Sequence, residues 1–185
     1  MYKELLEHMS LEIEQNTIER LSIKIMRKID NIYVAASFAY EDSAKTSQRK
    51  DLIEKTVERV KKFLPGNYYL PHQMKVPNAW DMSLENWAHQ VFHRDVDKLE
   101  KADIILFLSF GKENNAGSAW EIGYTYAHYQ FDHNYYKTTI MIKMTNDPES
   151  LMLYNSCDVI INEEDIEDYD WKEIPYNKIS LTKLS

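Results

Sequence analysis

The 185-residue sequence has little cysteine, glycine, proline or basic charge, and these shortages exclude several classes of protein. Its single cysteine, Cys157, excludes an internal disulfide and a zinc site built from several cysteines. Lys and Arg number 22 against 30 Asp and Glu, so a net charge of −8 argues against binding to nucleic-acid polymers or anionic membranes. The longest apolar run, residues 104–110, is too short to span a membrane. Without a signal-peptide pattern, the sequence predicts a cytoplasmic globular protein.

Strand and helix patterns alternate from residue 31 onward. Apolar runs predict buried strands at residues 32–38, 68–70, 104–110, 138–143 and 159–161. Helical periodicity predicts helices at residues 43–63, 84–100 and 118–130, and a short helix at 148–155. The alternation predicts an α/β fold, a flavodoxin-like open parallel sheet of about five strands with helices on both faces. In such a sheet the ligand lies beyond the carboxyl ends of the strands.

The first thirty residues have a different pattern. Apolar side chains recur at helical spacing over residues 3–29, a stretch without glycine or proline. We therefore expect residues 1–30 to form an N-terminal helical extension and residues 31–185 to form the functional domain. Two roles fit the extension: packing on the body or on a partner subunit, and recruitment of a partner.

The junction after the third predicted strand carries a carboxylate flanked by two of the four glycines. Glu121 falls in the predicted first helical turn, where the helix dipole favours the ionised carboxylate that a nucleophile requires. Gly117 predicts an unusual backbone conformation and a close approach of ligand, and Gly123 predicts close helix packing. The spacing Ser118-x-x-Glu121 is also that of a capping box, in which Glu121 has a structural role.

The helix before the third strand carries Asp95, a candidate general acid if burial or a second carboxylate raises its pKa. The alternative is a solvated charged face that Asp95 shares with Arg94 and Lys98. His89 and His93, one helical turn apart, supply only half of a metal site, and the sequence offers no third ligand.

Glu121 and Asp95 lie on helices that flank the third strand, so they can converge at its carboxyl end. Two carboxylates at one glycosidic carbon divide the chemistry between them. One attacks the anomeric carbon, and the other protonates the leaving group and then activates the acceptor. The same chemistry applies to an N-glycosidic bond, where the leaving group is a purine or pyrimidine.

Three motifs resemble the nucleoside 2-deoxyribosyltransferase family: IYVAASF at residues 32–38, W-x7-D-x7-D from Trp87 and G-S-A-x-E-x-G from Gly117. The resemblance covers residues 31 to about 161. It implies that Glu121 is the nucleophile, that Asp95 is the acid/base near the departing base, and that Tyr33 holds the nucleophile's carboxylate. The expected substrate-binding residues are Asn115, Gly117, Ser118, Trp87, His72, Gln73, Phe38, Ser150 and Met152.

Two positions depart from the family pattern, and both concern the 5′ end of the sugar. Transferases of the family usually have an aspartate six residues before the nucleophile, where this chain has Asn115. A neighbouring subunit usually contributes an asparagine, which is Ser150 in this chain. Relatives that hydrolyse nucleoside 5′-monophosphates carry small hydroxyl residues at these two positions, and Ser150 matches that pattern.

The motifs therefore predict transfer of a deoxyribosyl group from a nucleoside to another base through a glycosyl-Glu121 intermediate. The alternatives are hydrolysis of nucleoside 5′-monophosphates, hydrolysis of a larger ribosyl substrate such as NAD, and a nucleotide-sensing module without catalysis. The resemblance implies no metal or organic cofactor. It also implies a homo-oligomer in which Ser150 and Met152 complete the active site of a neighbour.

Overall fold

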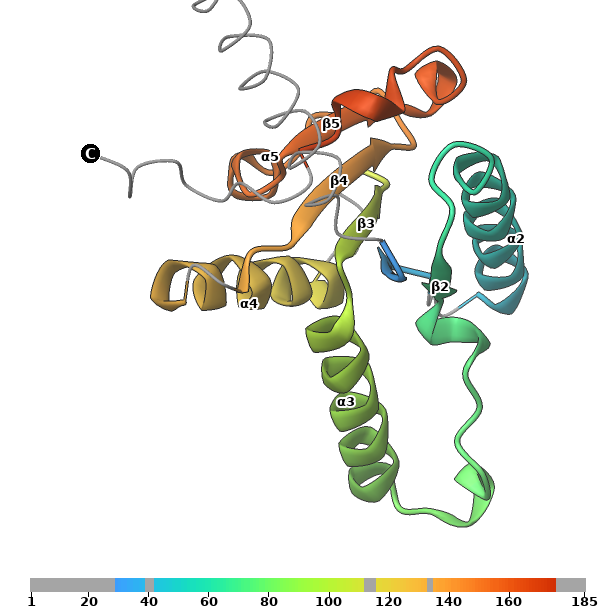
Figure 1. Ribbon diagram of the computed structural model, residues 1–185. Coiled ribbons are helices and arrows are strands. Elements are labelled where there is room, and N and C mark those ends of the chain that lie inside the picture. The colour runs from blue at the N-terminus through green and yellow to red at the C-terminus, as the bar shows by residue number, and fades with distance from the viewer. Residues whose placement is uncertain (1–28, 39–41, 112–115, 133–134, 176–185) are drawn as a thin grey trace, which may run out of the picture.

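Five parallel strands form one open sheet in the order β2-β1-β3-β4-β5 in the computed structural model, which describes residues 29–38, 42–111, 116–132 and 135–175 (Figure 1). The strands are β1 (Asn31–Ala36), β2 (Asn67–Tyr69), β3 (Ile104–Ser109), β4 (Thr138–Lys143) and β5 (Val159–Asn162). The helices in the described part are α2 (Ser43–Val60), α3 (Leu84–Lys101), α4 (Ala116–Phe131) and α5 (Leu151–Asn155). The predicted α/β fold is confirmed, whereas residues 1–28 of the extension expected at residues 1–30 lie outside the described residues.

In the described ranges, the connections add four short 3-10 helices to these elements. They lie at Pro71–Gln73, Ala79–Asp81, Glu163–Asp165 and Trp171–Glu173. Two of them lie in the connection between β2 and α3. No helix within the described ranges is both long and apolar enough to cross a membrane.

Each central strand divides its side chains between two cores, because successive residues of a strand point to opposite faces. On β1, Ile32 and Val34 join one core, and Tyr33 and Ala35 join the other. All four are at most 1% exposed. Burial on both faces explains why the strands appear in the sequence as continuous apolar runs.

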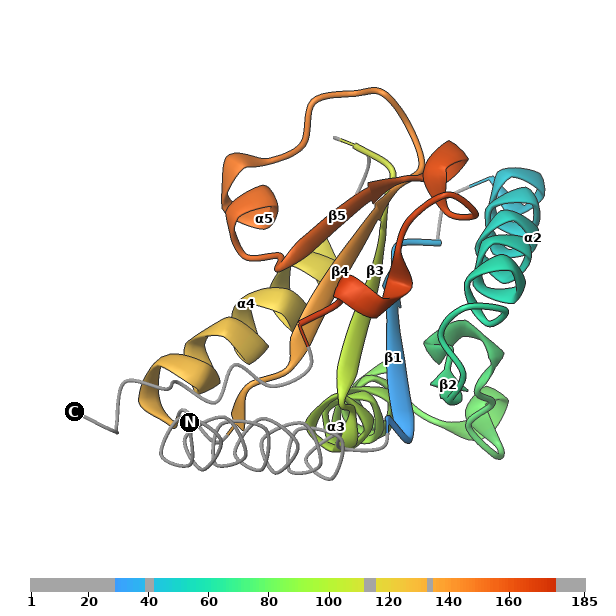
Figure 2. The same cartoon turned by 45° about the horizontal axis from the view of Figure 1, so that its top comes forward.

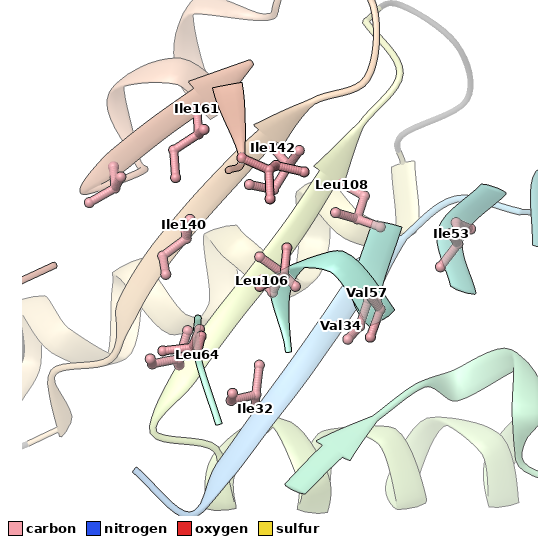
Figure 3. Close-up of a cluster of buried hydrophobic side chains, with 14 of the residues drawn as sticks. Ile32, Val34, Ile53, Val57, Leu64, Leu106, Leu108, Ile140, Ile142 and Ile161 are labelled. Atoms are coloured by element: carbon pink, nitrogen blue, oxygen red, sulfur yellow. The ribbon is translucent and has the colours of Figure 1, made fainter. Parts of the chain in front are cut away.

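Helix α2 covers the first face of the sheet, where Ile53, Val57 and Val60 pack against the strands (Figure 3). Trp171 and Ile174, from the segment after β5, complete this core. Helices α3, α4 and α5 cover the second face, and Figure 2 shows α2 and α4 on opposite sides of the sheet. The helices thus lie on both faces, as expected.

Helix α3 turns one face toward the carboxyl ends of β1 and β2. Ser83 caps the helix, and its Oγ accepts a hydrogen bond from the backbone N–H of Asn86. Trp87, Val91 and Asp95 follow at intervals of four residues and therefore share one face of the helix. Phe92, by contrast, is 49% exposed.

Gly111 is the glycine whose backbone conformation the fold requires. Its φ of +69° is the left-handed region, and an added Cβ would lie 2.7 Å from the Cβ of Asp147. The unusual backbone expected at Gly117 and the close helix packing expected at Gly123 are both wrong, whereas the close approach of a ligand to Gly117 stays a prediction. Gly117 is helical without a positive φ, and a Cβ on Gly123 would meet no atom within 4 Å, so Gly123 is not a site of close packing.

We expect Gly111→Ala to lower the free energy of unfolding by about 1–3 kcal/mol, because it adds both left-handed strain and a clash. Gly123→Ala is the matched control, since alanine in an open helical position stabilises by about 0.5–1 kcal/mol. Urea denaturation of the two variants measures both effects. Equal stability of the two variants would contradict this account of the turn after β3.

Candidate active site

A pocket of about 460 Å³ lies at the carboxyl ends of β1 and β2, between α3 and the start of α4. This is the position expected for a ligand site in an open parallel sheet. Residues that follow the two strands form one side, and residues of the two helices form the other. The lining residues are Ala36, Ser37, Phe38, Pro71, His72, Met74, Val76, Trp87, Val91, Arg94, Asp95, Gly117, Ser118 and Glu121.

Glu121 is held in this pocket by a tyrosine from the sheet. The hydroxyl of Tyr33 donates a hydrogen bond of 2.6 Å to Oε1 of Glu121. Tyr33 is the third residue of β1 and is 0% exposed. Burial and the nearby Glu121 raise the pKa of Tyr33 far above its usual range. Tyr33 therefore remains a hydrogen-bond donor at every working pH.

Burial raises the pKa of Glu121 to about 7. The hydrogen bond from Tyr33 opposes this rise, because it stabilises the carboxylate, and the charge of Asp95 adds to it. The expectation that Glu121 lies in the first helical turn is wrong, since α4 begins at Ala116 and Glu121 is its sixth residue. Burial, and not the helix dipole, dominates the electrostatics of this carboxyl group.

Asp95 is the second carboxylate of the pocket, and three donors converge on its Oδ1. The hydroxyl of Tyr69 donates to it at 2.5 Å, and Nε and Nη2 of Arg94 both lie 3.0 Å from it. Oδ2 has no hydrogen-bond partner within the described part of the chain. Asp95 is thus an anchored, part-buried group and not one member of a solvated charged face.

The two tyrosines are neighbours in the sheet, which explains why the two carboxylates lie in one pocket. Tyr33 and Tyr69 are register partners in the parallel pairing of β1 with β2. Their rings stack at a centroid distance of 5.5 Å. Each hydroxyl then reaches the carboxylate of one helix, Glu121 from α4 and Asp95 from α3. The register of two strands thereby positions both acidic groups.

The short helix after β2 contributes one expected residue to the pocket and turns another away. His72 lines the pocket, and its ring lies 5.3 Å from that of Phe38. Its Nε2 lies 3.1 Å from Oε1 of Glu54 on α2. Gln73 donates to the same oxygen at 3.0 Å and is not among the lining residues. Glu54 therefore holds both side chains from outside the pocket.

The start of α4 brings two small residues beside the nucleophile candidate. Gly117 and Ser118 both line the pocket with Glu121. An added Cβ on Gly117 would meet no atom within 4 Å, so the space beside it is open. Ser118 is the third residue of the helix and cannot be its cap, and Glu121 bonds to Tyr33 instead. The capping-box interpretation is therefore wrong.

Two further expected site residues do not line this pocket. Ser150 and Met152 line a separate groove of about 1010 Å³ between α4 and α5, together with Gly123 and Tyr126. Met152 is 79% exposed there. Asn115 lies outside the described residues. Within one subunit, therefore, the groove and the pocket lie on different sides of α4.

The surroundings of His89, His93 and Cys157 do not favour a role in metal binding or catalysis. The rings of His89 and His93 lie 4.2 Å apart, and the described residues contain no group of three His, Cys, Asp or Glu side chains that could hold a metal ion. Cys157 donates to the carbonyl of Leu153, and burial raises the pKa of its thiol to about 12. Such a thiol is unreactive at neutral pH.

Sequence analysis missed Tyr69 and Arg94. Tyr69 stands in a strand of three residues, and its contact with Asp95 depends on the pairing of β2 beside β1. Arg94 was expected on a solvated face, yet its guanidinium lines the pocket and its side chain is 25% exposed. One available signal was its position three residues after Val91, on the same helical face as Trp87.

Comparison with known proteins identifies the family of this chain. A family model described as nucleoside 2-deoxyribosyltransferase matches residues 32–154. The structure resembles a 2-deoxyribosyltransferase from the psychrotolerant bacterium Bacillus psychrosaccharolyticus, with a TM-score of 0.61 and 24% identity over 80% of this chain and 97% of that one. That protein is described as a biocatalyst for the synthesis of nucleosides. No curated protein sequence matches the chain significantly. Because the family model spans well over half of its length, the chain belongs to the nucleoside 2-deoxyribosyltransferase family.

Proposed function

We propose that the protein transfers a deoxyribosyl group from a nucleoside to another base through a covalent intermediate on Glu121. One observation carries this proposal: a buried carboxylate held by a tyrosine hydroxyl at 2.6 Å shares a pocket with a second, anchored carboxylate. Two carboxylates of unlike surroundings are what a two-step displacement at a glycosidic carbon needs. Membership of the family supports the choice of a nucleoside as substrate.

In the first step, the ionised carboxylate of Glu121 attacks C1′ of the sugar and the bond from C1′ to the base nitrogen breaks. Tyr33 orients the carboxylate for this attack through its hydrogen bond to Oε1. Asp95 supplies a proton to the departing base, which leaves as a neutral molecule. The glycosyl group is then held as an ester of Glu121.

In the second step, a new base enters the pocket and gives a proton to Asp95 as its nitrogen attacks C1′. The bond from C1′ to Glu121 breaks, and the carboxylate is regenerated. Trp87 and the apolar Met74, Val76 and Val91 offer a surface for a flat heterocycle. Such a surface favours a base over water as the acceptor, which supports transfer in preference to hydrolysis.

We further propose that the functional domain spans residues 31–185, with residues 1–30 as an extension, and that two subunits share each active site. The groove that holds Ser150 and Met152 is open in the isolated subunit. Leu151 is 86% exposed there and Met152 is 79% exposed, which is unusual for large apolar side chains. A second copy packed on this groove would bury Leu151 and Met152. Ser150 of the first copy would then face the pocket of the second copy.

Replacing the nucleophile tests the chemistry. We expect the wild-type protein, incubated with deoxyinosine and adenine, to release hypoxanthine and to form deoxyadenosine, both measured by chromatography. Glu121→Gln should lower the rate by at least about a thousandfold, because an amide cannot attack C1′. Wild-type turnover by this variant would refute the mechanism. Base release from nucleoside 5′-monophosphates alone would favour the hydrolase, and binding without turnover of any substrate would favour the sensor.

The same variant should keep its fold and gain stability at high pH. In the folded protein the pKa of Glu121 is about 7, above its ordinary value of 4.5, so ionisation destabilises the fold as pH rises from about 4.5 through 7. Gln removes this cost and still accepts the hydrogen bond from Tyr33. Its melting temperature should exceed that of the wild type at pH 8, by the equivalent of about 1–3 kcal/mol, and should match it near pH 4.

The pH dependence of the reaction follows from the same pKa. Because Glu121 attacks as a carboxylate, the acidic limb of the kcat/KM profile should rise with pH through an apparent pKa near 7. Tyr33→Phe removes the bond that lowers this pKa, so the rise should move to higher pH and the rate at pH 7 should fall about tenfold or more.

Tyr124→Phe is the matched control, since the Tyr124 hydroxyl bonds to the exposed Glu100 away from the pocket. Its profile should coincide with that of the wild type. An unshifted profile for Tyr33→Phe would show that Tyr33 does not act on Glu121.

Mixing variants tests the shared site. Met152→Asp should be inactive if Met152 enters a neighbour's pocket, and it should fold because this side chain is exposed in the subunit. Co-expression with Glu121→Gln creates pairs in which one site has an intact Glu121 and an intact Met152. Random pairing should restore about a quarter of wild-type activity. A mixture no more active than the sum of its separate components would contradict site sharing.

A further inference from the structure

We infer that Arg94 selects the base through an oxygen at C6, so that the enzyme takes 6-oxopurine deoxynucleosides in preference to deoxyadenosine. The inference rests on the proposed function and names its substrate class. In the two-step displacement Arg94 serves only to anchor Asp95, yet its guanidinium also lines the pocket beside the group that meets the base.

Three contacts hold the guanidinium of Arg94 in place. Nε and Nη2 contact Oδ1 of Asp95 at 3.0 Å, and Nη1 lies 3.4 Å from the carbonyl oxygen of Met74, a long and weak contact. A guanidinium has five N–H donors, and the Tyr69 hydroxyl is a further partner of Arg94, so at least one donor has no partner within the described ranges. Since Asp95 also keeps Oδ2 without such a partner, the pocket wall presents a donor and an acceptor side by side.

The chemistry of a purine leaving group places its C6 substituent next to this guanidinium. Asp95 gives its proton to a ring nitrogen of the departing base, and in a purine N7 is available on the edge that also carries C6. A group beside Asp95 on the same helix then faces the substituent at C6. An oxygen at C6 accepts from Arg94, whereas an amino group would bring N–H against N–H, because arginine has no acceptor.

Arginine and the amide side chains recognise different purines. Arginine binds O6 and N7 of guanine with two hydrogen bonds, whereas Asn and Gln bind N6 and N7 of adenine. No Asn or Gln occurs among the described residues that line the pocket. Gln73 is near in sequence, but Glu54 holds its amide at 3.0 Å outside the pocket. The described part of the pocket therefore favours an oxygen at C6.

The first test compares donor nucleosides with the wild-type protein and one common acceptor base, and the readout is release of the donor's free base. We expect kcat/KM to fall in the order deoxyinosine, purine 2′-deoxyriboside and deoxyadenosine, with about tenfold or more between the first and the last. Equal values, or a preference for deoxyadenosine, would overturn the role of Arg94 and leave the proposed function standing. Failure to release base from any nucleoside would instead overturn the proposed function itself.

Variants provide the second test. Arg94→Met should reduce the preference for deoxyinosine over deoxyadenosine to within about threefold, and Arg94→Lys, which keeps the charge but loses the planar fork, should fall between. The matched control is Arg59→Met, because Arg59 binds Glu163 and Glu167 on the other side of the sheet and should keep the wild-type ratio. If Arg94 had only a structural role, Arg94→Met would lower kcat/KM for deoxyinosine and for deoxyadenosine equally, and the ratio of the two values would not change. An unchanged ratio in Arg94→Met and Arg94→Lys would overturn the inference.

Discussion

The site depends on one interaction, the hydrogen bond from the buried hydroxyl of Tyr33 to the carboxylate of Glu121. A carboxylate beside the core of a sheet loses solvation, and Glu121 shows this as a pKa of about 7. The donor from β1 offsets part of that loss and fixes which oxygen points to the sheet. Without such a donor, burial would leave Glu121 protonated at neutral pH and ill-suited to attack.

The parallel sheet repeats this arrangement one strand away. Tyr69 stands beside Tyr33 in the register of β2 with β1, and it holds Asp95 as Tyr33 holds Glu121. Strand pairing is stiff, so the spacing of the two hydroxyls is fixed before any ligand binds. Helices α3 and α4 then need only bring their carboxylates to two prepared donors. Preorganisation of the site is therefore a property of the sheet.

Sequence patterns within single helices and strands predicted much of the fold and the two carboxylates of the site. Contacts that depend on how the elements pair could not be predicted in this way. Strand β3 is buried on both faces, so all of its consecutive residues are apolar or small and the run predicts the strand. The motif spacing likewise predicts that Asp95 and Glu121 lie on the two flanking helices. The start of α4 was misplaced, because the local pattern Ser118-x-x-Glu121 suggests a cap at a point already inside the helix. The contact of Tyr69 with Asp95 depends on strand register, which no local spacing encodes.

The raised pKa of Glu121 has a consequence for the proposed reaction. Protonation and ester formation both neutralise the carboxylate, so the burial that favours the proton also favours the covalent glycosyl intermediate. The oxocarbenium-like transition state carries positive charge at C1′, which a poorly solvated carboxylate stabilises more strongly than a solvated one would. Burial thus lowers the fraction of ionised Glu121 at pH 7 and increases the stabilisation that each ionised group supplies. The hydrogen bond from Tyr33 sets the balance between these two effects.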